Sequence, residues 1–214
     1  MKVFVQKVWL FCLTLLLCSA WYLPKGADAA DFSQAQLKLM STFVSNFTEL
    51  GLMNFDIKKG SSGKVRHLGG DPSNPELILF GIMHNYVNNF KSRIKPCPTQ
   101  GCVHGPRVID AKYVVESVKK YFDINLKNPR VKQSDQPYYF DGKLYHFADT
   151  DGEFVYYAEV KQATQKGGIV RMTGDIYNAD DKNDRPFTFV ATAKPYKWNG
   201  KDTWAILSLR TTKR

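Results

Sequence analysis

The sequence contains none of the short motifs that mark the common catalytic sites. It has no G-x-S-x-G nucleophile elbow, no H-E-x-x-H zinc motif, no phosphate-binding loop ending in Gly-Lys-Ser/Thr and no zinc-type cysteine pairs. It also has no internal repeat and no long low-complexity segment. These absences favour a single domain without a catalytic site of a familiar class, and they predict no cofactor and no bound metal.

Cysteine is scarce as well. Of the four cysteines, Cys12 and Cys18 lie in the apolar N-terminal segment, which leaves Cys97 and Cys102 in the body of the chain. Outside the cytoplasm two such thiols tend to pair, and the prolines and glycine around them favour a tight turn. We therefore expect a structural disulfide between them. The competing hypothesis is a metal site that adds His104 and perhaps His84. A redox-active pair more typically has two intervening residues, and this pair has four.

The one long apolar run, Val8–Leu23, is shorter than the roughly 20 residues that a membrane-spanning helix needs. Lys2 and Lys7 precede it, and Ala27-Asp28-Ala29 supplies the small residues of a cleavage site before Ala30. The pattern predicts a signal peptide over residues 1–29 with cleavage between Ala29 and Ala30. The protein would then be periplasmic or extracellular, one domain over residues 30–214, and not inserted in a membrane. An uncleaved membrane anchor is the alternative.

Acidic residues are outnumbered by basic ones. The formal net charge is +10, and loss of three lysines and one aspartate with residues 1–29 lowers it to +8. This excess favours an anionic partner, either an envelope protein or an anionic polymer. The basic residues are scattered and form no arm of the kind that binds nucleic acid, so we expect no nucleic-acid partner. Ordinary solvated surface charge is the other interpretation.

The hydrophobic pattern changes period along the chain. Apolar residues recur at helical spacing over 33–50, from Asn74 or Pro75 onward, and over 108–122, and Ser33 and Gln36 have the spacing of a capping box at the start of the first helix. Period-two alternation follows, with a hairpin signal at Asp141-Gly142 and candidate strands over 138–140, 144–147, 154–164, 169–177, 187–193 and 203–210. We predict an α+β fold in which three N-terminal helices (about 33–122) pack on a curved antiparallel sheet of five or six strands (about 137–211).

Two segments carry a resemblance. The helix with Phe80-Gly81-Ile82-Met83-His84-Asn85-Tyr86-Val87-Asn88-Asn89 and the closing Tyr196-Lys197-Trp198-Asn199-Gly200-Lys201-Asp202, together with the signal peptide, resemble small exported bacterial proteins of unknown function. A curved sheet wrapped on helices would be similar to cystatin-like or nuclear transport factor two-like folds. The resemblance implies no catalytic residues.

Candidate ligand-binding residues come from two elements. His84, Asn85 and Asn88 form a polar cluster on an otherwise apolar helix, and this cluster either lines a pocket or forms a solvated helix face. Tyr157 and Trp198 belong to a set of sheet aromatics that either form a binding platform or act as ordinary cross-strand pairs.

These features lead to two functional hypotheses. The first is an exported, non-enzymatic binding module of the cell envelope that uses its sheet face or a pocket between sheet and helix. The alternative is a small pocket-based hydrolase or isomerase with His84 or His146 as general base and an aspartate or tyrosine as its partner.

Overall fold

The structure is a computed structural model that describes residues 32–58, 65–99, 101–127, 136–150 and 155–214. The helices in these ranges are α2 (Gln34–Thr48), α3 (Pro75–Arg93) and α4 (Ala111–Phe122). The strands are β1 (Phe55–Asp56), β2 (Arg66–His67), β3 (Ile94–Pro96), β4 (Arg107–Asp110), β5 (Tyr138–Phe140), β6 (Leu144–Phe147), β7 (Tyr156–Lys166), β8 (Ile169–Asn178), β9 (Phe187–Trp198) and β10 (Lys201–Lys213).

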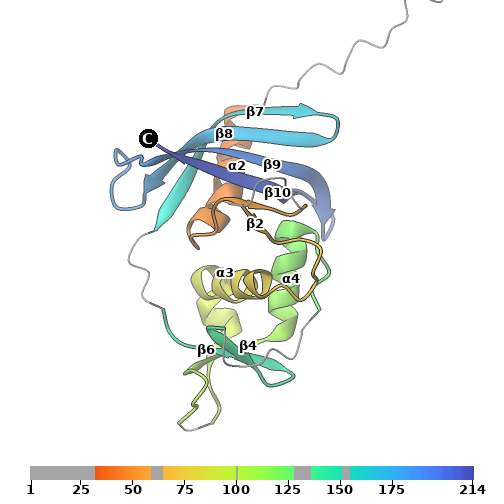
Figure 1. The fold of residues 1–214 in the computed structure, drawn as a ribbon, viewed down its shortest axis with the longest axis vertical. Coiled ribbons are helices and arrows are strands. Elements are labelled where there is room, and N and C mark those ends of the chain that lie inside the picture. The colour runs from red at the N-terminus through yellow and green to blue at the C-terminus, as the bar shows by residue number, and fades with distance from the viewer. Residues whose placement is uncertain (1–31, 59–64, 100, 128–135, 151–154) are drawn as a thin grey trace, which may run out of the picture.

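The strands form two sheets, and α3 and α4 lie between them (Figure 1). The larger sheet has the order β2-β1-β10-β9-β8-β7, and the smaller has the order β3-β4-β6-β5. The α+β class is confirmed, but the predicted arrangement of three N-terminal helices on one sheet is wrong. Helices and strands alternate through the first part of the chain, and the β5–β6 hairpin joins β3 and β4 instead of the long strands.

The short strands explain the error. The four strands β1 to β4 have two to four residues, too few to show a period of two, and no turn signal marks them as the Asp141-Gly142 hairpin marks β5 and β6. Val108 and Ile109 had been assigned to the third helix, yet they belong to β4, and both are buried. The helix begins only after Asp110, whose side chain accepts a hydrogen bond from the backbone N–H of Lys112 at 2.9 Å.

Local signals with a specific mechanism were more reliable. Ser33 caps α2 in a capping box with Gln36, in which each side chain accepts a hydrogen bond from the other residue's backbone N–H. Proline occupies the first position of α3. The Asp141-Gly142 turn joins β5 to β6, with Gly142 at φ 104°, a conformation that favours glycine.

One predicted strand face is shifted by a bulge. Alternation placed Ala205, Leu207 and Leu209 on one side of the last strand. The register between β9 and β10 shifts between Ile206 and Ser208, so Ile206 and Leu209 both reach the main core. An extra residue in one strand inverts the alternation beyond it, and composition alone does not locate such a residue.

Helix α2 protects the edge strand of the larger sheet. Strand β7 has a neighbour on one side only, and three hydroxyl groups of α2 bond to the main chain of this strand. Ser45 Oγ accepts from Ala158 N–H at 3.0 Å, Ser41 Oγ accepts from Val160 N–H at 2.8 Å, and Thr48 Oγ1 donates to the Tyr156 carbonyl at 2.8 Å. Covering an edge in this way prevents its pairing with another chain.

A single buried cluster connects the two sheets. Phe47 of α2 stands 5.4 Å from Phe80 of α3 and 5.5 Å from Phe122 of α4, measured between ring centroids. The same cluster contains Tyr145 of the smaller sheet and Met172 of the larger one. Among the described residues, no helix has the length and apolar character needed to cross a bilayer. The predicted signal peptide and its Ala29–Ala30 cleavage site lie outside the described residues.

Candidate functional site

The smaller sheet has a core face and an outer face. Ile94, Ile109 and Tyr145 belong to the buried cluster and face the helices. Side chains alternate along strands, so the neighbouring residues point the other way. Lys95, Val108, His146 and Tyr139 lie side by side in register across this outer face.

A groove with a volume of about 310 Å³ runs beside this row. That volume falls within the usual range for small-ligand sites. Among the described residues, its charged lining consists of Arg93, Lys95, Lys112 and Lys143 with Asp110 as the one carboxylate. The other lining residues are Ser92, Pro96, Pro98, Val108, Tyr113 and Leu144. Four cations against one anion give the groove a positive potential.

The four cations differ in how they are held. Arg93 donates to Asn85 Oδ1 at 2.9 Å, lies 3.5 Å from Glu116 and stacks on the Tyr113 ring. Lys112 lies 3.7 Å from Asp110. Lys95 and Lys143 are exposed and form no ion pair with any residue in the part of the chain that the structure describes. These two ammonium groups are therefore available to an incoming anion.

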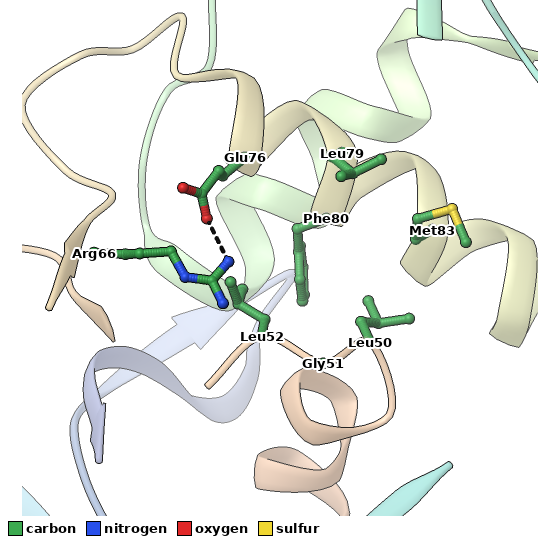
Figure 2. A pocket seen from close by; sticks show the side chains of 8 residues that line it. All are labelled: Leu50, Gly51, Leu52, Arg66, Glu76, Leu79, Phe80 and Met83. Atoms are coloured by element: carbon green, nitrogen blue, oxygen red, sulfur yellow. Dashed lines mark hydrogen bonds and ion pairs between the residues drawn. The ribbon is translucent and has the colours of Figure 1, made fainter. Parts of the chain in front are cut away.

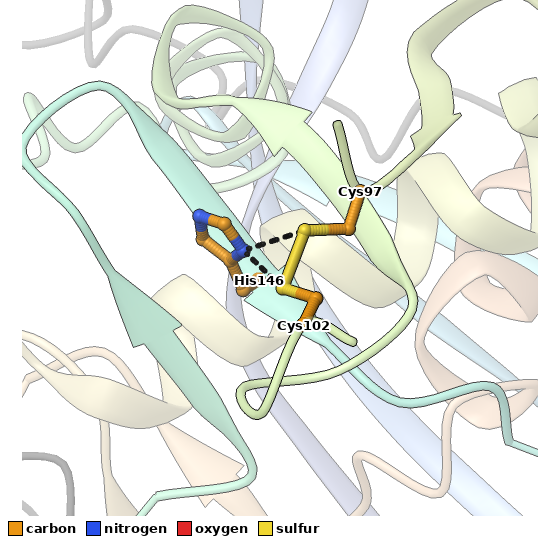
Figure 3. Close-up of side chains that lie close together, drawn as sticks. All are labelled: Cys97, Cys102 and His146. Carbon is orange, nitrogen blue, oxygen red and sulfur yellow. Dashed lines mark hydrogen bonds between the residues drawn. A yellow bond between two sulfur atoms is a disulfide. The ribbon is translucent and has the colours of Figure 1, made fainter. Parts of the chain in front are cut away.

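The predicted disulfide is confirmed. Cys97 and Cys102 are bonded in the connection between β3 and β4, and the imidazole of His146 faces both sulfurs (Figure 3). Nδ1 of His146 lies 3.6 Å from Cys97 Sγ and 3.3 Å from Cys102 Sγ. The other ring nitrogen, Nε2, lies 3.0 Å from Asp141 Oδ2. A sulfur pair, an imidazole and a carboxylate thus form one chain of contacts.

The Asp141 carboxylate is fixed by the hairpin turn that it starts. Its Oδ1 accepts hydrogen bonds from the backbone N–H groups of Lys143 at 2.8 Å and Leu144 at 2.7 Å. Burial would raise the pKa of the Asp141 carboxyl, but the hydrogen bonds from His146, Leu144 and Lys143 outweigh it and hold this pKa below its usual value. Asp141 is therefore ionised at neutral pH and favours a proton on Nε2 of His146.

The metal hypothesis named the wrong histidines. Cys97, Cys102 and His146 place two sulfurs and one nitrogen within 4.8 Å of one another. His104 packs on Tyr139, with ring centroids 3.9 Å apart, and His84 lies in the α3–α4 interface. A metal would need the sulfurs as thiolates, and in this structure they are bonded to each other.

His84 is a core residue. It is 5 % exposed, stacked against Phe80 at 5.7 Å and edge-on to Tyr121 at 4.7 Å. Burial, together with the charges of Lys120 and Arg93, lowers the pKa of His84 to about 4. The imidazole lines neither of the two cavities described in this section, so both sequence interpretations, a pocket lining and a solvated face, fail for this residue.

Asn85 and Asn88 differ from each other. Asn85 is fully buried, and its Nδ2 donates to the Gly81 carbonyl at 2.7 Å and to Ser117 Oγ at 2.8 Å. It ties α3 to α4. Asn88 is exposed, and its Nδ2 lies 3.1 Å from Nδ1 of His84. The three residues are neighbours, as the sequence predicted, but they support a helix interface and not a pocket.

Tyr157 and Trp198 do not come together. Tyr157 starts β7 and pairs in register with Tyr177, with ring centroids 6.0 Å apart. Trp198 ends β9 at the opposite end of the sheet. A twelve-residue strand at about 3.3 Å per residue separates these ends by a distance on the order of 36 Å. The two rings cannot form one platform.

A second cavity lies between the end of α2 and the first turns of α3 (Figure 2). It is mostly apolar, with a volume of about 140 Å³, and the Arg66–Glu76 ion pair at 3.0 Å stands at its edge. The lining residues are Leu50, Gly51, Leu52, Arg66, Glu76, Leu79, Phe80 and Met83. This volume is below the usual range for ligand sites, and Gly51 and Arg66 in its lining are exposed, so the cavity is a small surface hollow.

Comparisons with protein-family models, with curated proteins and with solved structures gave no match for this chain.

Proposed function

We propose that the protein is an exported binding module that captures an anionic partner in the basic groove of the smaller sheet. The observation that carries the proposal is the charge of this groove, in which four cations face one carboxylate. Export rests on the predicted signal peptide, and the Cys97–Cys102 disulfide supports it because such bonds persist mainly in oxidising compartments. The partner's matching chemistry is a row of carboxylates or phosphates on an envelope protein or an anionic polymer.

The shape of the groove supports a chain-like partner. Arg93 is held by Asn85 and Glu116 and so presents a fixed charge at one side. Lys95 extends from β3 and Lys143 from the β5–β6 turn, so each can meet a separate anionic group. Val108, Pro98 and Leu144 supply apolar contact between these charges. This alternation suits a segment that carries repeated anionic groups.

The hydrolase alternative finds no support at His84. Its imidazole is enclosed by aromatic rings, and a pKa of about 4 makes it a weak base at neutral pH. His146 has the expected aspartate partner, but its free nitrogen faces a disulfide.

The test is a binding measurement with two probes, hexaglutamate and short-chain polyphosphate, by isothermal titration calorimetry at low and high salt. The double substitution Lys95→Gln/Lys143→Gln should weaken binding about tenfold, since each exposed charge contact contributes about 0.5–1 kcal/mol. Lys166→Gln/Lys182→Gln, which removes two exposed charges from the larger-sheet side, is the matched control.

Each outcome has a definite meaning. Weakening by the groove variant alone supports the groove, and the stronger probe identifies carboxylate or phosphate as the preferred group. Equal weakening by both variants, or no binding of either probe, would mean that the basic residues are only solvated surface charge.

A further inference from the structure

A disulfide that only stabilised the β3–β4 connection would not need its contact with His146. A disulfide sulfur is a weak hydrogen-bond acceptor and needs no partner. The bond joins cysteines only five positions apart, and closing so small a loop contributes less to stability than closing a long one would. Yet a nearly buried imidazole is aimed at both sulfurs, and a carboxylate fixes the imidazole from behind (Figure 3).

The two cysteines are more exposed to solvent than the histidine that faces them. Cys97 and Cys102 are both partly exposed, whereas His146 is only 7 % exposed. An incoming thiol can therefore reach the sulfurs from solvent while the imidazole stays shielded behind them. Thiol–disulfide exchange requires this combination of an accessible sulfur and a stabilised leaving thiolate.

The hydrogen bonds assign a role to each ring nitrogen. Asp141 Oδ2 accepts a hydrogen bond from the Nε2–H group of His146. The other ring nitrogen, Nδ1, is then the one that can exchange a proton with sulfur. With a second proton on Nδ1 the ring is a cation beside the sulfurs, stabilised by the Asp141 carboxylate. A cation next to a cysteine lowers the pKa of its thiol.

We propose that the Cys97–Cys102 disulfide is redox-active and exchanges with a dithiol of a protein or peptide substrate. His146 is the catalytic proton donor and acceptor, and Asp141 is a positioning residue. The proposal is independent of what the basic groove binds.

The first step breaks the protein's disulfide. A substrate thiolate attacks Cys97 Sγ and forms a mixed disulfide, while the electron pair of the Cys97–Cys102 bond moves to Cys102 Sγ. Cys102 is the leaving sulfur because it lies nearer to Nδ1, at 3.3 Å against 3.6 Å. It takes the Nδ1 proton and becomes a thiol.

The second step releases the substrate. Neutral His146 takes the proton of the substrate's second thiol, and the resulting thiolate attacks the substrate sulfur in the mixed disulfide. The substrate leaves as a disulfide, oxidised by two electrons. Cys97 is left as a thiolate beside the re-formed imidazolium, and the protein's disulfide has been reduced by the same two electrons.

The experiment measures reactivity at the peptide that carries Cys97 and Cys102, so that Cys12 and Cys18 do not interfere. Purified full-length protein is reduced by dithiothreitol, the dithiol probe, across pH 5 to 9, and reduction is quantified by alkylation and mass spectrometry. The reduced protein is then alkylated by iodoacetamide over the same pH range. We expect one thiol to titrate clearly below the ordinary cysteine pKa of about 8.5.

Three variants separate catalysis from structure. His146→Gln should slow reduction near pH 6.5 by about tenfold or more and raise the thiol titration midpoint. Asp141→Asn keeps a strong hairpin turn, because Asn-Gly favours this turn as well as Asp-Gly does. Like His146→Gln, it should slow reduction and raise the thiol titration midpoint. His67→Gln, which alters an exposed histidine of the larger sheet, should match the unmodified protein.

An ordinary thiol midpoint in the unmodified protein would overturn the proposal. So would reduction rates in the Asp141→Asn variant equal to those of the unmodified protein. Either result would leave the disulfide as a structural brace. Neither would affect the groove, whose test uses other residues and a binding readout.

Discussion

At the scale of single residues, the clearest lesson concerns polar side chains inside a helix. His84 and Asn85 lie on a helix whose other residues are largely apolar, and polar residues in such a place have to be satisfied by partners or reach solvent. The structure satisfies both internally, through Asn88, Ser117 and Arg93. The polar side chains of His84 and Asn85 therefore mark the interface between α3 and α4.

The environment of His84 predicts a pH dependence of stability. Its pKa in the folded protein is about 4, below the ordinary value of 6.5, because of burial and the charges of Lys120 and Arg93. The unfolded chain thus binds the proton more tightly. The free energy of unfolding should be fully retained above pH 6.5 and fall by about 3 kcal/mol as pH drops toward 4.

Urea unfolding at several pH values between 4 and 7 checks this prediction. His84→Phe, which keeps a ring between Phe80 and Tyr121, should flatten the profile in that window. His67→Gln, which alters an exposed histidine, should leave the profile as it is. A profile equally steep in His84→Phe would place the titrating group elsewhere.

At the scale of secondary-structure elements, the close packing of α3 on α4 depends on a glycine. Gly81 of α3 lies against Val114 of α4, and a Cβ added at Gly81 would stand 2.7 Å from Val114 Cγ1 and 2.9 Å from its carbonyl oxygen. Real Cβ atoms do not approach backbone atoms this closely. Only glycine lets α3 and α4 pack at this distance.

Gly81→Ala therefore sets two effects against each other. Alanine favours the helix by about 0.5–1 kcal/mol, whereas overpacking typically costs 1–3 kcal/mol, and the rigid backbone oxygen of Val114 leaves little room to relax. We expect a net loss of about 1–2 kcal/mol in the free energy of unfolding, measured by urea denaturation. Val87→Ala, at an exposed site of the same helix, is the control. An unchanged or higher stability of Gly81→Ala would contradict the packing argument.

At the scale of the whole molecule, the shared core joins the two sheets. Tyr138, Tyr145 and Phe147 of the smaller sheet lie in the same buried cluster as Val170 and Met172 of the larger one. A core that is common to both sheets cannot be lost from one without exposing the other. We therefore expect the two sheets to unfold together.

Native-state hydrogen exchange tests this cooperativity. As urea is added, the opening free energies of the Tyr145 amide in β6 and the Ile206 amide in β10 should converge on one global value. A persistently lower value for β6 would show that the smaller sheet, with its groove and disulfide, opens as a separate unit.

Features that depend on residues close together in the chain could be predicted before the fold was known. The capping box at Ser33, the start of α3 at Pro75, the Asp141-Gly142 hairpin and the Cys97–Cys102 pair were all predicted, since each depends on chemistry within a few positions. The resemblance to small exported bacterial proteins, and the signal peptide that contributes to it, stay predictions.

The meeting of segments far apart in the chain could not be predicted and follows from the three-dimensional fold. The groove takes its cations from the end of α3 and from β3, α4 and the β5–β6 turn, and the disulfide meets a histidine and an aspartate 39 to 49 positions away in the chain. No local pattern encodes such meetings. They arise because short strands pair across the chain once the core has formed, and each of these strands is too short to specify its own partner.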